Sequence, residues 1–185
     1  MKKLFACAAI LLAAIVVFAQ APAPKAPPKS PAARAEGKIG PATISIDYSS
    51  PRVNGREGKI FPADGLIRHD STYPIWRAGA NAATTLTTDA DITIGNLAVP
   101  KGTYTLYVDI SNPSSWVLIV NKQTGQWGTK YDKTQDLGRV PLSTGKSPAL
   151  VEDLVYSVVA HGKHKGTLTL AGEDVTASAA VAAAK

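Results

Sequence analysis

The sequence predicts an all-β fold: an antiparallel β-sandwich of Greek-key or jelly-roll type, in a single domain with little helix. Three observations support this. Apolar and polar residues alternate with a period of two through most of the chain after residue 37, as in half-buried strands. Turn signals recur about every ten residues, which is typical of sandwiches and barrels. No long window carries an apolar stripe at helical spacing.

The first 19 residues have the layout of a secretory signal peptide. Met1-Lys2-Lys3 is a short basic region, residues 4–18 are apolar, and Ala19 precedes the expected cleavage point. The apolar run is shorter than the ~20 residues that span a bilayer. The sequence therefore predicts an exported protein, periplasmic or extracellular, with no transmembrane segment after cleavage of the signal.

Cysteine usage and charge exclude some classes of protein. Cys7 is the only cysteine, so the predicted mature chain has none and its core, not disulfides, must hold the fold. The formal charge of +6 falls to +4 once Lys2 and Lys3 are removed. No basic helix and no interleaving of basic with aromatic residues accompanies this modest charge, which argues against a nucleic-acid partner.

The next segment, residues 20–36, is rich in alanine, proline and lysine. Such a composition cannot bury enough apolar surface to offset the entropy lost on ordering, so we expect a disordered linker. Residues 37–180 then form the β-sandwich domain, a usual length for one domain with its own core. Residues 181–185 are expected to be a disordered tail.

The strands follow from the alternation and are expected at residues 43–48, 92–94, 103–110, 116–120, 140–142 and 154–158. Residues 116–120 are apolar on both faces, which is typical of a central strand. Leu168 and Leu170, followed by the turn signal Gly172-Glu173-Asp174 and Val175, predict a closing hairpin. Residues 147–153 are the best candidate for a short helical turn.

One turn has a more specific interpretation. Residues 97–104 have the spacing of a tyrosine corner, in which a Tyr hydroxyl bonds back to the backbone where the chain passes between sheets. Tyr104 would supply that hydroxyl. An ordinary turn followed by a core Tyr explains the same spacing, and the sequence does not separate the two.

Residue types used in catalysis occur, but without the spacing that catalysis needs. His161 and His164 lie in an expected hairpin loop that also contains two lysines, so an exposed basic turn is favoured over a zinc or copper site. His69-Asp70-Ser71 contains triad residue types, yet a triad brings its members from separate elements. No phosphate-binding loop, dinucleotide fingerprint or metal-ligand cluster occurs. We therefore assign no catalytic residue, no metal and no cofactor.

The remaining unusual residues are planar or aromatic. Aromatic rings stack on sugars or bases, and guanidinium groups bind carboxylates with two hydrogen bonds. The candidate ligand-binding residues are Arg52, Trp76, Arg77, Asn81 and Trp127. A structural interpretation competes with this one: both Trp side chains would fill the core, Arg77 would pair with a buried Asp, and Asn81 would cap a turn.

A series of motifs also occurs in the order found in a known family: Asp47-Tyr48-Ser49-Ser50-Pro51, Gly55-Arg56, Lys59-Ile60-Phe61, residues 76–81, Thr84-Thr85, residues 100–106, Asn121-Lys122 and Gln126-Trp127-Gly128. With these motifs the chain resembles the secreted bacterial proteins grouped as domain of unknown function 2911, over residues 38–178. Members of that family often carry Glu directly after Gly-Ala-Asn, where this chain has Ala82. If the family's function uses that Glu, this protein has lost or replaced it. The resemblance implies fold and export rather than an activity.

Three functional hypotheses remain. The leading one is a non-catalytic envelope or secreted binding module for a glycan or a peptide. The second is an extracytoplasmic hydrolase using Asp47, Asp70 or His69, at least two of which would have to converge in one cleft. The third is a purely structural partner domain, which predicts a large exposed apolar patch. The sequence does not define the oligomeric state.

Overall fold

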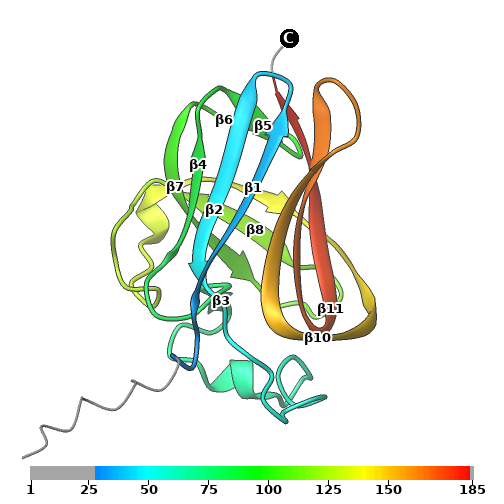
Figure 1. Ribbon diagram of the computed structural model, residues 1–185. Helices are drawn as coiled ribbons and strands as arrows, with labels where there is room; N and C mark the ends of the chain where they lie inside the picture. Colours follow the sequence, from blue (N-terminus) through cyan, green and yellow to red (C-terminus); the bar gives the residue numbers. More distant parts are fainter. Residues whose placement is uncertain (1–27, 184–185) are drawn as a thin grey trace, which may run out of the picture.

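The computed structural model describes residues 28–183, which form two antiparallel sheets packed face to face (Figure 1). The predicted all-β sandwich with little helix is confirmed. Within the described residues, no helix is long and apolar enough to cross a membrane. The predicted signal peptide, residues 1–19, lies outside the described residues.

The first sheet has the order β1-β2-β4-β7-β8-β9, with the short strand β3 also paired to β7. Its strands are β1 (Ala32–Ile39), β2 (Ala42–Ser49), β3 (Ile75–Trp76), β4 (Thr84–Thr88), β7 (Gly102–Asp109), β8 (Val117–Asn121) and β9 (Asp136–Pro141). The second sheet has the order β10-β11-β5-β6. Its strands are β5 (Ile92–Ile94), β6 (Leu97–Val99), β10 (Ser143–Ala160) and β11 (Lys165–Ala183). Two 3-10 helices complete the structure, η1 (Leu66–His69) and η2 (Lys133–Gln135).

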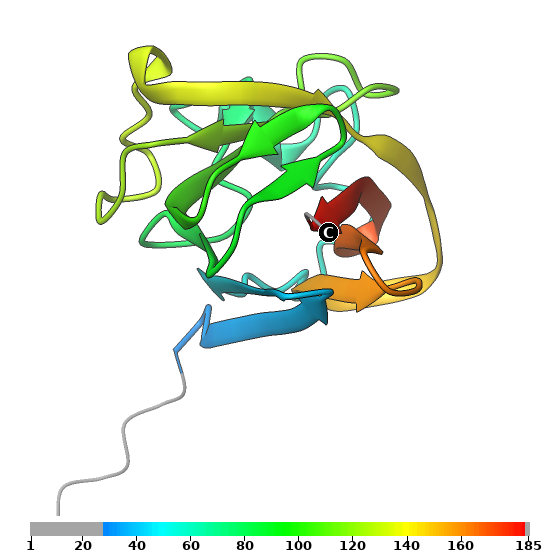
Figure 2. The same ribbon diagram turned by 90° about the horizontal axis from the view of Figure 1, so that it is seen from above.

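The core lies between the two sheets and follows the predicted alternation. Alternate residues of each main strand point inward and are almost fully buried, among them Ile44, Ile46, Leu106, Val108, Leu118, Val120, Leu168 and Leu170. β8 is a central strand, as predicted, because it lies between β7 and β9. The chain crosses from the first sheet to the second at Leu142, which alone separates β9 from β10. Figure 2 shows β10 curving around one side of the molecule.

The tyrosine corner is confirmed. β6 belongs to one sheet and β7 to the other, so the chain crosses between the sheets at Pro100 and Lys101. The hydroxyl group of Tyr104 donates a 2.9 Å hydrogen bond to the carbonyl oxygen of Pro100. This bond fixes the crossing, as the spacing of the sequence predicts.

The predicted linker is too long at its C-terminal end, because β1 begins at Ala32 and pairs with β2 along its whole length. The strand escapes detection because its inward residues, Ala33, Ala35 and Gly37, are small and give little apolar contrast with their neighbours. Gly37 must be small, since a Cβ atom there would overlap the backbone of Val158. At the other end, β11 continues through the first part of the predicted tail, and residues 184–185 lie outside the described residues.

Two further expectations are wrong, and both concern one bend. β11 does not turn at Gly172-Glu173-Asp174 but continues through it, so the predicted closing hairpin does not exist. Residues 147–153 belong to β10 rather than to a helical turn. The β10–β11 register shifts on both sides of Val151, and the two strands curve together there (Figure 1). The turn residues therefore lie opposite a β-bulge whose extra residues belong to β10, and such a bulge bends the paired strands without ending them.

Candidate functional site

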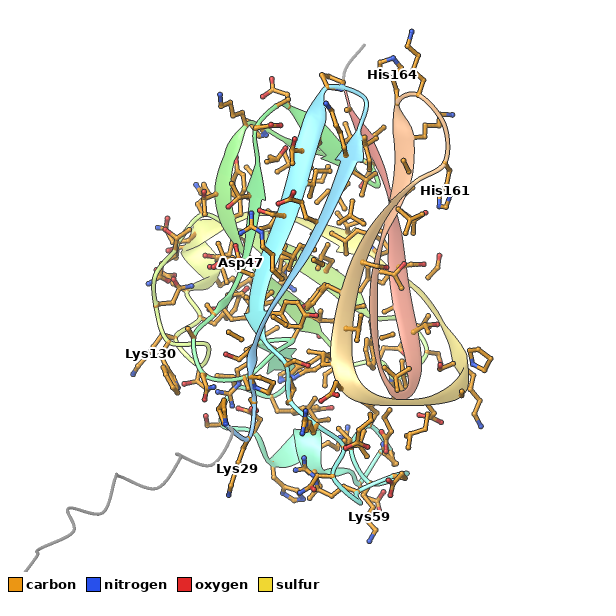
Figure 3. The ribbon with its side chains drawn as sticks, in the orientation of Figure 1. Lys29, Asp47, Lys59, Lys130, His161 and His164 are labelled. Atoms are coloured by element: carbon orange, nitrogen blue, oxygen red, sulfur yellow. The ribbon has the colours of Figure 1, made fainter. Side chains whose placement is uncertain are left out.

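A cleft of about 480 Å³ lies at the end of the sandwich where β10 and β11 bend. Three parts of the chain line it: the long loop between β2 and β3, the segment between β3 and β4, and the bend itself. Figure 3 labels Lys59 on the long loop at this end of the molecule. The volume falls in the range of ligand-binding pockets, roughly 300–1,000 Å³.

The long loop, residues 51–74, is called the strap here, and two kinds of contact hold it down. The ring of Phe61 packs on the rings of Trp76 and Trp116, with centroids 5.4 and 5.1 Å away. The backbone N–H groups of Lys59 and Ile60 donate to Oε1 of Glu173, at 3.2 and 3.5 Å. The strap is thus fastened both to the core and to the bend of β11.

The segment between β3 and β4, residues 77–83, is called the bulged segment. β3 and β4 lie end to end along the same edge of β7, because β8 occupies the other edge. The residues between them leave the sheet, and two of them, Ala78 and Asn81, adopt left-handed φ angles of 46° and 58°. Such angles in non-glycine residues cost about 1–3 kcal/mol each and persist only where surrounding bonds enforce them.

The hydrogen bonds that enforce these angles are made by the backbone of Ala78 and Ala80. The carbonyl oxygen of Ala78 accepts hydrogen bonds from the hydroxyl of Tyr156 at 2.8 Å and from that of Thr84 at 3.1 Å. The N–H group of Ala80 donates to the carbonyl oxygen of Ser49 at 3.0 Å. The bulged segment is therefore fixed by residues of both sheets and forms a rigid wall of the cleft.

An ion pair between Arg77 and Asp70 connects this wall to the strap. Nη2 of Arg77 donates to Oδ2 of Asp70 at 2.9 Å, and the two side chains are only 22% and 17% exposed. Burial raises the pKa of Asp70, but the hydrogen bond and charge of Arg77, with the bonds from Thr72, outweigh burial and hold this pKa below its usual value. Asp70 is therefore ionised near neutral pH.

Glu173 is the most unusual residue of the cleft. It is 2% exposed, adopts a left-handed φ angle of 55°, and lines the cleft from the bend of β11. Its Oε1 holds the strap, whereas its buried Oε2 has no hydrogen-bond partner among residues 28–183. Buried carboxylate oxygens are normally satisfied, so this atom calls for an explanation.

The rim of the cleft carries charges of both signs. Nε of Arg52 lies 2.6 Å from Oδ1 of Asp153 in an exposed ion pair. Glu152 accepts a 2.9 Å hydrogen bond from the N–H group of Asn54. The guanidinium of Arg56 donates to the carbonyl oxygens of Val53 and Arg52 rather than to a carboxylate. In all, three arginines and three carboxylates line the cleft.

Four of the five predicted binding residues come together in this cleft: Arg52, Trp76, Arg77 and Asn81. Trp76 is 7% exposed, and its ring meets those of Phe61 and Trp116 edge to face, so it is also part of the core. Trp127 does not line the cleft, and at 54% exposure it does not fill the core either. Its backbone pairs with that of Ala82.

Only two of the three candidate hydrolase residues lie in the cleft. His69 and Asp70 line the cleft, whereas Asp47 forms an ion pair with Arg34 of β1, at 2.8 Å. Figure 3 shows Asp47 on β2, away from the end marked by Lys59. His161 and His164 lie in the β10–β11 hairpin at the opposite end, as expected for a basic turn. In the part of the chain described, no group of three or more His, Cys, Asp or Glu could hold a metal ion.

Glu173 lines the cleft but was not among the residues predicted from the sequence, although the sequence carries a signal for it. In β11 the inward residues occupy even positions up to Gly172, as at Leu168 and Leu170, and odd positions from Ala177 and Ala179 onward. Such a change of phase within one strand indicates a β-bulge. The bulge turns residue 173 inward, where unbroken alternation would place it outward.

Comparison with known proteins identifies a family. A family model described as a protein of unknown function (DUF2911) matches residues 30–181. The match spans nearly all of the described residues and begins just before β1. No curated protein and no solved structure matches the chain.

Proposed function

We propose that this chain, which belongs to the family of proteins of unknown function DUF2911, is a non-catalytic binding module that holds part of a peptide in the cleft. One observation carries the proposal: apolar side chains and charged groups of both signs converge in a single cleft of about 480 Å³. A peptide offers the matching chemistry, since its backbone supplies hydrogen-bond donors and acceptors while its side chains supply charge and apolar surface.

The cleft suits a peptide better than a glycan. Sugars bind best where an aromatic ring presents an open face. The ring of Trp76 is buried against Phe61 and Trp116, and the exposed Trp127 lies outside the cleft. The other groups available for recognition include guanidinium groups, carboxylates, the amide of Asn81 and aliphatic side chains such as those of Ile60 and Leu154.

Export is part of the proposal. The basic start and apolar run of residues 1–18 support secretion to the periplasm or the outside of the cell, where peptides are available as ligands. N-terminal sequencing of the protein recovered from outside the cytoplasm is expected to begin at Gln20. Recovery of the protein only in the cytoplasm, with Met1 retained, would contradict export.

A hydrolase is the second candidate, because His69 and Asp70 meet the condition of lying in one cleft. Asp70, however, is already engaged by Arg77 and Thr72. The two functions predict different outcomes on incubation with peptide: a binding module leaves it intact, whereas a hydrolase yields fragments detectable by mass spectrometry.

The proposed binding is tested by thermal unfolding with pooled tripeptides and, separately, with glycan fragments. A ligand at 100 times its Kd is expected to stabilise the protein by ~2.7 kcal/mol. Arg77→Ala should abolish the shift caused by peptides. Arg34→Ala is the matched control, because Arg34 also pairs with an Asp but lies on β1, away from the cleft. If no peptide pool raises the melting temperature, the proposal fails.

A further inference from the structure

We propose that Glu173 recognises a primary ammonium group of the bound peptide, either a lysine side chain or a free N-terminus. This inference rests on the proposed function and names the chemistry of its ligand. The central observation is the buried Oε2 of Glu173, which lines the cleft and has no hydrogen-bond partner within the described chain.

The two oxygens of Glu173 play different roles. Oε1 accepts from the N–H groups of Lys59 and Ile60 and so fastens the strap. The carbonyl oxygen of a neutral amide could do the same work. A carboxylate adds a second oxygen that can only accept, together with a negative charge, and burying a charge without a partner is unfavourable. The choice of Glu thus indicates that something outside the described contacts meets Oε2.

The backbone conformation at Glu173 directs its side chain toward the cleft. The phase change of β11 turns residue 173 from the outer to the inner face, and it does so at a left-handed φ angle that Glu seldom adopts. Strained backbone of this kind gathers at binding and active sites, where surrounding structure enforces it. A strand that kept its phase would place residue 173 on the outer face and leave the cleft without its buried carboxylate.

None of the cations lining the cleft meets Oε2. Arg52 pairs with Asp153, Arg77 pairs with Asp70, and Arg56 donates to two backbone carbonyl oxygens. The ligand must therefore supply the donor. An ammonium group is compact and offers three N–H donors, which suits a confined acceptor better than the planar fork of a guanidinium group.

The surface beside Glu173 fits the rest of a lysine side chain. Ile60, Val151 and Leu154 line the same region of the cleft, and Gly172 is packed so closely on Leu154 that a Cβ atom would lie 2.9 Å from its Cδ1. Lysine buries its aliphatic stem along such apolar surface while its charge reaches a polar partner. Arg56 and Arg77 then lie within the same cleft to meet carbonyl or carboxylate oxygens of the peptide.

The test compares matched tripeptide pools by their apparent Kd for the protein. The first pair is Xaa-Lys-Xaa against Xaa-acetyllysine-Xaa, both with blocked ends, and the second is Xaa-Xaa-Xaa with a free against an acetylated N-terminus. We expect about tenfold tighter binding of the ammonium-bearing pool in at least one pair, as for one charge-assisted hydrogen bond. Glu173→Gln, which keeps an acceptor for the strap, should remove this preference. Glu36→Gln, on the exposed face of β1, should keep it.

Each outcome is decisive. Equal affinity within both pairs overturns the inference, and so does a preference that survives in Glu173→Gln. Binding of neutral glycan fragments alone also overturns it, because the cleft would then take a ligand without an ammonium group. If no peptide pool binds, the proposed function itself fails, which is a different result. Should Glu173→Gln fail to fold, the comparison of pools on the unchanged protein still decides.

Discussion

The guanidinium group of Arg77 donates a 2.9 Å hydrogen bond to the carboxylate of Asp70, and this ion pair joins the bulged segment to the strap. Both side chains are largely buried, so solvent screens the pair less than it screens the exposed pair of Arg34 and Asp47. The two walls of the cleft are therefore coupled through one charged contact.

This coupling predicts a pH dependence. The pKa of Asp70 is lower in the folded than in the unfolded protein, so at acidic pH the folded state binds fewer protons than the unfolded state does. The stability due to Asp70 is present above its unfolded pKa of ~3.9 and is lost as the pH falls through the folded value. Denaturant unfolding at several pH values from 6 to about 2 should show a shallower loss of unfolding free energy in Asp70→Asn. Parallel curves for the two proteins would contradict the argument.

The bond between Glu173 and the strap can be tested by hydrogen exchange. In Glu173→Ala, the N–H group of Ile60 loses its acceptor and is expected to exchange about tenfold faster or more, whereas the N–H group of Lys59 keeps the carbonyl oxygen of Arg56 as an acceptor at 3.0 Å. Glu152→Ala is the comparison: it should expose the N–H group of Asn54 and leave those of Lys59 and Ile60 unchanged. Equal protection of the Ile60 N–H group in Glu173→Ala and in the unchanged protein would remove Glu173 as the strap anchor.

The tyrosine corner has an expected energetic value. Tyr104→Phe removes the bond to the carbonyl oxygen of Pro100 and should lower the unfolding free energy by about 1 kcal/mol. In Tyr73→Phe the lost hydroxyl contacts Arg68 in an exposed pair, so a change within about 0.5 kcal/mol is expected. Urea denaturation measures both, and equal losses would argue against a special role for the corner.

The bulged segment depends on Tyr156. Its buried hydroxyl donates to the carbonyl oxygen of Ala78, which also accepts from Thr84, so Tyr156→Phe should cost about 1 kcal/mol, as for the loss of one hydrogen bond. Burial also raises the pKa of Tyr156, so its contribution to stability is full below pH ~10 and falls as the pH rises above it. Tyr156→Phe should therefore lose less stability than the unchanged protein between pH 9 and pH 11, as followed by thermal unfolding.

The sequence predicts those parts of the fold that local pattern determines. Alternation at Ile44, Ile46 and Leu106 reports a core face directly, and the spacing before Tyr104 reports a crossing between sheets. β1 is different, because Ala33 and Ala35 differ little from their neighbours in apolar character. Its strand conformation depends on pairing with β2, a contact that no local window contains.

The site was predictable in composition but not in geometry. Arg52, Trp76, Arg77 and Asn81 are recognisable as unusual residues, and they do line one cleft. Glu173 is not, because a bulge inverts the side on which its side chain lies and a Gly-Glu-Asp sequence equally suits a turn. Trp127 has the same residue type as Trp76, yet only the packing around each ring places one in the core and the other on the surface.

The most direct test of the account asks whether ligands occupy this cleft. Ala80 lines it, so Ala80→Trp is expected to fill part of its volume, whereas Ala98→Trp adds the same ring at an exposed position of β6. Thermal unfolding of the three proteins should be measured with and without a saturating tripeptide pool. We predict that the pool raises the melting temperature of the unchanged protein and of Ala98→Trp but not of Ala80→Trp. An undiminished shift in Ala80→Trp would show that binding occurs elsewhere and contradict the account.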